Sequence, residues 1–426
     1  MIIYSFRFLI YLFPLSLIIG PAISDINLTL IACLTIIYII IKKDFFYFHG
    51  NLTIIFLIFF LLLIASSINS HSKILSFEYS LFYSRFFLFS IGIYIALRNN
   101  FININHLIFV FTCIYFFLFI DGYYQYFTGY DFFNNKYDGD RLSSIFGEEK
   151  ILGSFISRTF PLYFGLICMQ KKNPLLLFIS VIGFILSDVL IILSGDRTSA
   201  FYLLISCVII LILTKEYRII RLATLIISLI LIVFIFTNTP MVKERIIDKT
   251  IDDMTKIIPD ENNSYNNIFN KFQFFTETHH NFMIVSLKIF NDNKIFGSGP
   301  KNYRVLCNDE KYLINKKPYC SSHPHNIYFQ LLAETGLFTT LIVLAGFFYV
   351  MFLFFRQFYS ITLKRNFLFT DAHICFLTCL FITLFPFIPT GNFFGNWMNA
   401  IFYLPLGFLL NEIYKSKINN ESSISN

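Results

Sequence analysis

Two histidines, His323 and His325, stand on either side of a proline in the segment SSHPHNIYFQLLAETG, which directly precedes a long apolar run. A neutral imidazole can take a proton from a hydroxyl group near neutral pH, so both histidines are candidate general bases. A metal site would need further ligands nearby, for which Cys320 is a candidate, and we predict no metal. On chemistry alone, a loop histidine is more often a hydrogen-bonding residue than a base, so both interpretations stay open.

Several charged residues lie inside or beside apolar runs, where a charge is costly unless it serves a purpose. They are Arg85, Arg141, Arg158, Asp188 and Arg197. A guanidinium group stays charged and binds phosphate through two parallel hydrogen bonds, so a converging set of arginines would suit a lipid-linked diphosphate. The alternatives are side chains that reach the membrane interface, or a structural ion pair such as Arg158 with Asp188.

The elements that must position these residues are mostly apolar. The chain has 426 residues, of which 56% are hydrophobic, 19% aromatic and only 14% charged, whereas about a quarter of a soluble protein is charged. Continuous apolar runs such as 52–67 and 225–236 are typical of an integral membrane protein in contact with membrane lipids. The net charge of +7 belongs mostly to loops, and no basic-aromatic pattern indicates nucleic acid as a partner.

A helix needs about 20 apolar residues to cross a bilayer, and the sequence has about twelve such stretches. They cover approximately 5–22, 26–42, 52–68, 79–97, 102–121, 151–169, 175–194, 198–214, 220–237, 330–355, 367–388 and 397–413. We therefore predict an all-α integral membrane protein with about twelve transmembrane helices. The first five lie in 1–121, the next four in 151–237 and the last three in 330–413, followed by a polar tail over 414–426.

Lysine and arginine are enriched on the cytoplasmic side of membrane helices and therefore predict orientation. One set of connections holds Lys42, Lys43, Arg98, Lys171, Lys172, Lys215, Arg218, Arg221, Arg356, Lys364, Arg365, Lys415 and Lys417. The opposite short connections hold only Lys73 and Arg197, so we predict that both termini and the tail are cytoplasmic. The loops 122–150 and 238–329 then lie outside, and helical apolar spacing over 278–293 predicts a small extracytoplasmic cap between helices nine and ten.

The cysteines follow the same division. Six of the eight lie in or beside predicted spans, where cysteine acts as a small hydrophobe. Cys307 and Cys320 both fall in the large outer loop, where an oxidising compartment allows them to form a disulfide. This bond would anchor the chain just before the two histidines, and the alternative is a pair of free thiols.

A longer pattern resembles the signature of the bacterial O-antigen ligases. It reads His325 and Asn326, nine residues, Gly336, two residues and Thr339. The segments RLSSIFGEE (141–149), SGDRTSA (194–200) and IFGSGPKNYR (295–304) resemble further parts of the O-antigen ligase and polymerase superfamily, and the resemblance covers about 120–345. One departure is the helix before the Gly-x-Gly segment, where the family often has an arginine and this chain has His279 and His280. Arg245 or Arg304 would then take the place of that arginine, unless the glycan donor used by this family is bound differently.

The resemblance implies a glycosyltransferase in the bacterial inner membrane, with its active site facing the periplasm. Such enzymes transfer a glycan from undecaprenyl diphosphate to the lipid A core oligosaccharide without a cofactor. Arg141 and Arg197 would neutralise the departing diphosphate, and His325 would take the proton of the acceptor hydroxyl. His323 and Asn326 would orient His325 or bind sugar. The further candidates for substrate binding are Arg85, Arg158 and Arg304.

Three other functions compete with this interpretation. A polysaccharide polymerase would use the same donor with a second lipid-linked glycan as acceptor, but the complete pattern from His325 to Thr339 favours the ligase. A transporter often has an internal repeat and a polar path through the membrane centre, and neither is evident in the sequence. A structural membrane protein would not need the histidine and arginine set.

Overall fold

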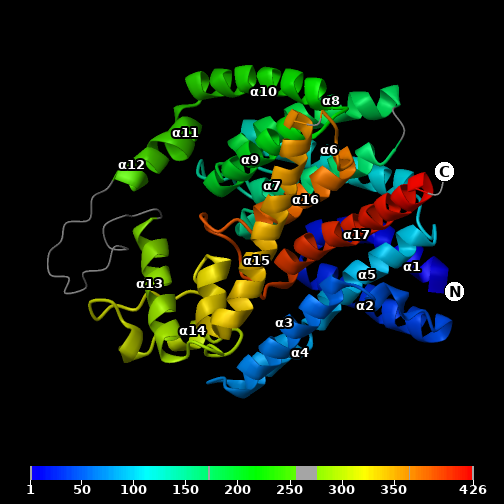
Figure 1. Cartoon of the computed structure of the whole chain (residues 1–426). Helices are drawn as coiled ribbons and strands as arrows, with labels where there is room; N and C mark the ends of the chain where they lie inside the picture. Colours follow the sequence, from blue (N-terminus) through cyan, green and yellow to red (C-terminus); the bar gives the residue numbers. More distant parts are fainter. Residues whose placement is uncertain (1, 171–172, 256–275, 364, 425–426) are drawn as a thin grey trace.

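The computed structural model of the chain describes residues 2–170, 173–255, 276–363 and 365–424, which form helices and loops without a β-strand (Figure 1). The helices are α1 (Ile2–Ile19), α2 (Pro21–Lys42), α3 (Asn51–Ile68), α4 (Lys73–Leu81), α5 (Ser84–Arg98), α6 (Ile104–Thr128), α7 (Leu152–Cys168), α8 (Pro174–Leu193), α9 (Arg197–Leu213), α10 (Arg218–Asn238), α11 (Pro240–Lys243), α12 (Lys249–Thr255), α13 (Glu277–Asp292), α14 (Tyr303–Leu306), α15 (Ile327–Leu363), α16 (Asp371–Thr383) and α17 (Asn396–Ile424). The all-α prediction is confirmed. Lys171, Lys172 and Lys364, which contributed to the predicted orientation, lie outside the described residues, as does the part of the predicted outer loop over 256–275.

Each predicted span overlaps one of these helices. Within the described residues, eight helical segments are long and apolar enough to cross a membrane: α1, α2, α3, α4 together with α5, α6, α8, α10 and α15. Three more, α7, α9 and α16, are apolar but only 17, 17 and 13 residues long. A multi-pass membrane protein is therefore supported, while the count of twelve spans stays a prediction.

Three predicted boundaries differ from the helices observed. The stretch 79–97 divides between α4 and α5. The stretch 367–388 forms only α16, because the chain leaves helical geometry at Leu384. Residues 414–424 of the predicted tail instead continue α17, since no glycine or proline follows Gly407 to stop the helix.

The centre of the bundle is formed by α7 and α16, which pack against each other and bury nearly all their side chains. By contrast, α3 and α10 bury few residues and expose rows of isoleucine, leucine and phenylalanine. Such an apolar outer surface is expected of helices that face lipid. In Figure 1 the two termini lie on one side of the bundle, and α13 and α14 lie on the other.

One buried ion pair corrects the sequence analysis. Asp188 of α8 does not pair with Arg158, because its two carboxylate oxygens accept hydrogen bonds from the guanidinium of Arg221 at 2.7 and 2.9 Å. Both side chains are only 2% exposed, so Arg221 is an internal residue of α10 rather than part of a cytoplasmic connection. A carboxylate buried to this degree is stable only with a cationic partner, and Arg221 of α10 supplies that partner.

The long helix α15 changes direction at Gly336, where φ is 78° and ψ is −171°. A Cβ at this position would lie 2.2 Å from the carbonyl oxygen of Ile295, so only glycine fits. The break leaves two carbonyl groups of α15 without their helical partners. The loop before α14 supplies the missing donors, with Ser298 N to Ala333 O at 2.9 Å and Gly299 N to Glu334 O at 2.7 Å.

The same loop is fixed on its other side by the corner between α3 and α4. Asn302 donates from Nδ2 to the hydroxyl oxygens of Ser70 at 2.8 Å and Ser76 at 2.7 Å. Its Oδ1 accepts from Ser72 N at 3.1 Å. The 297–303 segment, which contains the Gly-x-Gly pattern, therefore joins α3, α4 and α15 into one scaffold.

Candidate functional site

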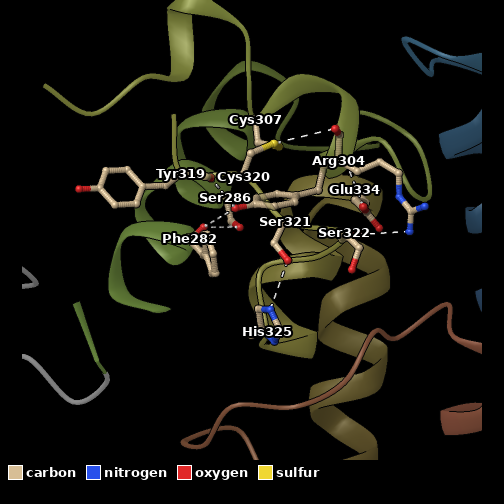
Figure 2. The surroundings of a disulfide bond; sticks show 11 residues. Phe282, Ser286, Arg304, Cys307, Tyr319, Cys320, Ser321, Ser322, His325 and Glu334 are labelled. Carbon is tan, nitrogen blue, oxygen red and sulfur yellow. Dashed lines mark hydrogen bonds between the residues drawn. A yellow bond between two sulfur atoms is a disulfide. The ribbon is translucent and has the colours of Figure 1, made fainter. Parts of the chain in front are cut away.

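A disulfide joins Cys307 to Cys320 with a Cα–Cα distance of 5.2 Å (Figure 2). It closes the loop that follows α14 and holds the start of the segment that carries both histidines. Arg304 adds a second restraint, because its Nη2 donates to the carbonyl oxygen of Ser322 at 3.4 Å. The chain that leads to the histidines is therefore held from two directions.

The backbone of His325 is held just as closely. Its φ of 55° lies in the left-handed region, which residues other than glycine rarely adopt. The His325 carbonyl oxygen accepts from Thr390 N at 2.8 Å. Asn326 then caps α15, with Oδ1 accepting from Tyr328 N at 3.0 Å, while Nδ2 donates to the carbonyl oxygen of Pro386 at 2.8 Å. These contacts fix the start of α15 directly after His325.

The His325 ring lies among other aromatic rings. Its centroid is 4.2 Å from that of His323 and 5.1 Å from that of His279 on α13. The ring of Phe282 stacks on it at 5.6 Å with an interplanar angle of 23°. The Nε2 atom of His325 lies 3.3 Å from Ser321 Oγ (Figure 2). We call His279, His323 and His325 the histidine cluster.

Burial keeps the histidine cluster neutral. Loss of hydration is the largest cause that lowers the pKa of His323 to about 3 and the pKa of His279 to about 4. The same cause lowers the pKa of His325. All three imidazoles are thus neutral at pH 7, the state in which an imidazole can accept a proton. Within the part of the chain that the structure describes, no three His, Cys, Asp or Glu side chains are placed to hold a metal ion.

The charges of three cations act on the histidine cluster. The charge of Arg197, the first residue of α9, is a further cause of the lowered pKa of His279. The charges of Lys301 and Arg304 act in the same way on His323. Lys301 is only 5% exposed, and burial lowers the pKa of its ammonium group to about 8, so the group stays mostly charged at pH 7. The sequence analysis missed Lys301, because a lysine in a turn segment gives no sign of burial.

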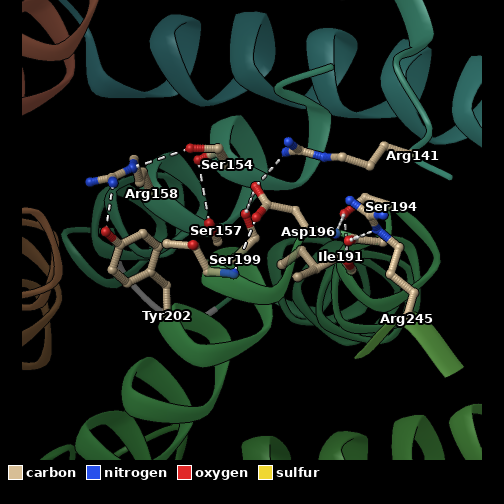
Figure 3. A network of polar contacts seen from close by, with 12 residues as sticks. Arg141, Ser154, Ser157, Arg158, Ile191, Ser194, Asp196, Ser199, Tyr202 and Arg245 are labelled. Carbon is tan, nitrogen blue, oxygen red and sulfur yellow. Dashed lines mark hydrogen bonds and ion pairs between the residues drawn. The ribbon is translucent and has the colours of Figure 1, made fainter. Parts of the chain in front are cut away.

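A second group of charges surrounds the turn between α8 and α9 (Figure 3). Arg141 pairs with Asp196 at 3.0 Å, and Asp196 also caps α9. Arg245 donates from Nε to the carbonyl oxygen of Gly195 at 2.8 Å and forms an ion pair with Asp140. We call Arg141, Arg197 and Arg245, with Asp140 and Asp196, the arginine turn. It brings together Arg141 and Arg197, which were predicted to bind the diphosphate, and Arg245. Arg245 was a candidate to replace the arginine that the family often has before the Gly-x-Gly segment.

Two other predicted arginines have hydrogen-bond or ion-pair partners of their own. Arg158 is 2% exposed inside α7 and donates to Tyr202 Oη at 2.7 Å and to Thr383 Oγ1 at 3.3 Å (Figure 3). Arg85, near the start of α5, pairs with Asp25 of α2 at 2.8 Å. Arg158 therefore ties α7 to α9 and α16, whereas Arg85 belongs to a different part of the bundle.

Comparison with known proteins agrees with this geometry. Residues 180–344 match the profile of a family described as O-antigen ligase. A search of curated proteins finds no match to the chain. The matched residues run from α8 to the first part of α15 and include Arg197, Lys301, the disulfide and the whole histidine cluster. Through residues 180–344 the chain is similar to the O-antigen ligase family, and this match supports a relation to the O-antigen ligase superfamily.

Proposed function

We propose that the protein is an O-antigen ligase of the bacterial inner membrane. It moves a glycan from undecaprenyl diphosphate to a hydroxyl group of the lipid A core oligosaccharide on the periplasmic face. The family match over 180–344 and the apolar helices support this class of enzyme. The observation that carries the proposal is the buried histidine cluster, in which the rings of His323 and His279 lie 4.2 and 5.1 Å from the ring of His325, with the charges of Arg197, Lys301 and Arg304 acting on it.

In this mechanism His325 is the general base. Its imidazole nitrogen takes the proton of the acceptor hydroxyl while the hydroxyl oxygen forms a bond to the anomeric carbon of the donor. The bond from that carbon to the diphosphate oxygen breaks, and its electron pair leaves with the diphosphate. Proton transfer by a positioned base contributes roughly 10²–10⁴-fold in rate. The stacked ring of Phe282 and the tilted ring of His323 keep the base in place.

The leaving diphosphate gains negative charge during this step, and fixed cations stabilise that charge. We assign this role to Arg197 and Arg141, with Arg304 and Lys301 as further cations that act on His323. Arg158 acts as a positioning residue, because its hydrogen bond to Tyr202 holds the first turns of α9, where Arg197 begins.

The spacing of the sequence signature also has a physical meaning in this proposal. Asn326 caps α15 and Gly336 breaks it, so the nine intervening residues set the length of one short rigid helix. Thr339 is buried just beyond the break, where its Oγ1 donates to the carbonyl oxygen of Thr335 at 3.3 Å. The histidines precede the N-terminal end of this helix, and the 297–299 loop binds to its C-terminal end. Both segments are thus attached to one helix, and the charge of Lys301 acts on His323.

Deletion of the gene in its own bacterium tests the proposal. A ligase predicts loss of glycan chains on the lipid A core, with long polymer retained on undecaprenyl diphosphate. A core that carries a single repeat unit would instead identify a polymerase. An unchanged lipopolysaccharide profile with altered solute uptake would identify a transporter. Complementation with Arg197→Ala should fail to restore the ladder, although the variant reaches the membrane in normal amounts.

A further inference from the structure

A polar cavity of about 320 Å³ lies outside the site described above, between α2, α4, α5 and the start of α17. It is lined by Asp25, Thr29, Glu78, Tyr79, Phe82, Tyr83, Arg85, Phe86, Phe394 and Asn396. These residues come from helices that are distant in sequence, and the cavity is large enough for a sugar ring with its substituents. Neither the family match, which begins at residue 180 and ends at 344, nor the signature includes any of them.

The charges of the cavity disfavour a phosphate ligand. Asp25 and Glu78 supply two carboxylates and Arg85 one guanidinium, which gives a formal net charge of −1. The guanidinium is already engaged, because Arg85 Nη2 donates to Asp25 Oδ1 at 2.8 Å and to Asn396 Oδ1 at 3.2 Å. A diphosphate entering this cavity would meet the carboxylate of Glu78 and a guanidinium already paired with Asp25, and like charges at close range are unfavourable. The arginine turn has the opposite balance of charge, because its three arginines outnumber its two aspartates.

The remaining lining groups suit a sugar. Carboxylate, amide, guanidinium and phenol groups together offer acceptors and donors for neighbouring hydroxyl groups. Phe82 is 60% exposed and Tyr79 is half-buried, so aromatic surface is available to the apolar face of a ring.

The cavity adjoins the proposed reaction site through Tyr79. The Lys301 ammonium nitrogen lies 4.5 Å from the centroid of the Tyr79 ring, so this residue borders both regions. One turn earlier on α4, Ser76 Oγ donates to the carbonyl oxygen of Pro300 at 3.0 Å. A glycan whose reacting sugar lies at the histidine cluster could therefore place a neighbouring sugar in the cavity.

We propose that this cavity is a carbohydrate subsite that binds one neutral or amino sugar of a substrate glycan and excludes its diphosphate. The inference rests on the proposed function and extends that function, because it separates the site for the sugar from the site for the diphosphate. The sugar can come from the transferred glycan or from the accepting oligosaccharide, which share this chemistry.

Photo-crosslinking in living cells tests the subsite with the full chain and its natural substrates. The photoreactive residue p-benzoylphenylalanine replaces Phe82, and in a matched control it replaces Phe355, which is 62% exposed on α15 and does not line the cavity. We expect hexose- or hexosamine-containing adducts by mass spectrometry at position 82 and phospholipid adducts alone at position 355. Only phospholipid adducts, or none, at position 82 would overturn the inference.

Two strains distinguish the sources of the sugar. If adducts vanish in a strain that makes no lipid-linked glycan, the subsite holds the transferred glycan. If they vanish in a strain whose core oligosaccharide is truncated, it holds the acceptor. If the carbohydrate adducts persist unchanged in a strain that lacks both, the inference is wrong, because the captured sugar is then not a substrate.

A binding measurement on purified protein gives an independent readout. Trp397, the single tryptophan of the chain, directly follows Asn396 at the cavity. We expect oligosaccharide released from the bacterium's lipopolysaccharide by mild acid to change its fluorescence, and Glu78→Gln to weaken that binding about fivefold. Inorganic pyrophosphate should produce no change, and the reverse preference would overturn the inference. If the deletion strain keeps normal lipopolysaccharide but oligosaccharide still binds, the proposed enzyme function fails while the subsite stands.

Discussion

The arginine turn and the histidine cluster lie near each other but differ in how their charges are neutralised. Asp196 and Asp140 neutralise Arg141 and Arg245. In the histidine cluster, by contrast, the charges that act on the rings are cationic, and burial removes the charge of the imidazoles. The arginine turn thus holds its charges in ion pairs, whereas the histidine cluster holds uncharged imidazoles that can accept protons.

This difference fits the two tasks of glycan transfer from a diphosphate. A base must be uncharged before it takes a proton, and a buried imidazole beside cations meets that condition at neutral pH. An anion site must offer cations, but unpaired guanidinium groups at the membrane surface would bind any anion. Carboxylates such as Asp196 therefore make a diphosphate compete for Arg141, which favours ligands of high negative charge.

The largest expected effect is the loss of the base. His325→Ala should reduce glycan transfer by roughly 10²–10⁴-fold, with normal amounts of protein in the membrane. His280→Ala, at the neighbouring histidine of α13, is the matched control and should retain activity. Lipopolysaccharide gels and an assay of transfer in membranes measure both variants. A normal ladder from His325→Ala would remove the cluster from the mechanism.

The next effect concerns the scaffold that holds the cluster. Gly336→Ala forces a side chain into a positive φ and toward the Ile295 carbonyl oxygen, with strain of about 1–3 kcal/mol. We expect a lower unfolding temperature in detergent and reduced transfer. Gly346→Ala is the control, because nothing lies within 4 Å of a Cβ at that helical position. Equal behaviour of the two variants would contradict the role of the helix break.

The cluster should also give the protein a characteristic response to acid. Unfolded histidines bind protons near pH 6.5, whereas folded His279 and His323 do so only near pH 4 and 3. The unfolded state therefore takes up protons first, and the free energy of unfolding falls as pH drops below about 6.5 and is fully regained above it. The unfolding temperature of His323→Asn should fall less steeply between pH 6.5 and 4. Parallel curves for wild type and variant would argue against a neutral, buried cluster.

The smallest effect tests the paired charges of the arginine turn. Asp196→Asn preserves a capping residue for α9 but removes the carboxylate that competes for Arg141. Because this ion pair is partly exposed, its contribution is at most about 1 kcal/mol, and we expect a KM for the lipid-linked donor that is a few-fold lower. Arg141→Ala should raise the same KM. An increase in KM for Asp196→Asn would show that the carboxylate itself assists binding.

Part of this site could be predicted from single segments. The spacing from His325 through Gly336 to Thr339 indicates a superfamily signature, and local chemistry explains it, since asparagine caps helices and glycine tolerates positive φ. The positions of Cys307 and Cys320 in one outer loop likewise indicated a bond, and the structure joins them. Such features depend on residues close together in the chain.

Other features depended on segments far apart. Thr390 holds the backbone of His325 from the loop between α16 and α17, and Lys301 is buried against α4. Nothing near either residue in the sequence signals these contacts. The true partner of Asp188 was missed for the same reason.

The sequence by itself determined an all-α membrane protein. Helices that cross a bilayer must be long and apolar, and such runs can be recognised from the order of the residues alone. It also determined the chemical groups available at the histidine segment and at the α8–α9 turn. Only the tertiary structure decided which charges are neutralised and which imidazoles are dehydrated. Those properties depend on the distances and burial that arise when separate helices pack, and hydropathy does not encode them.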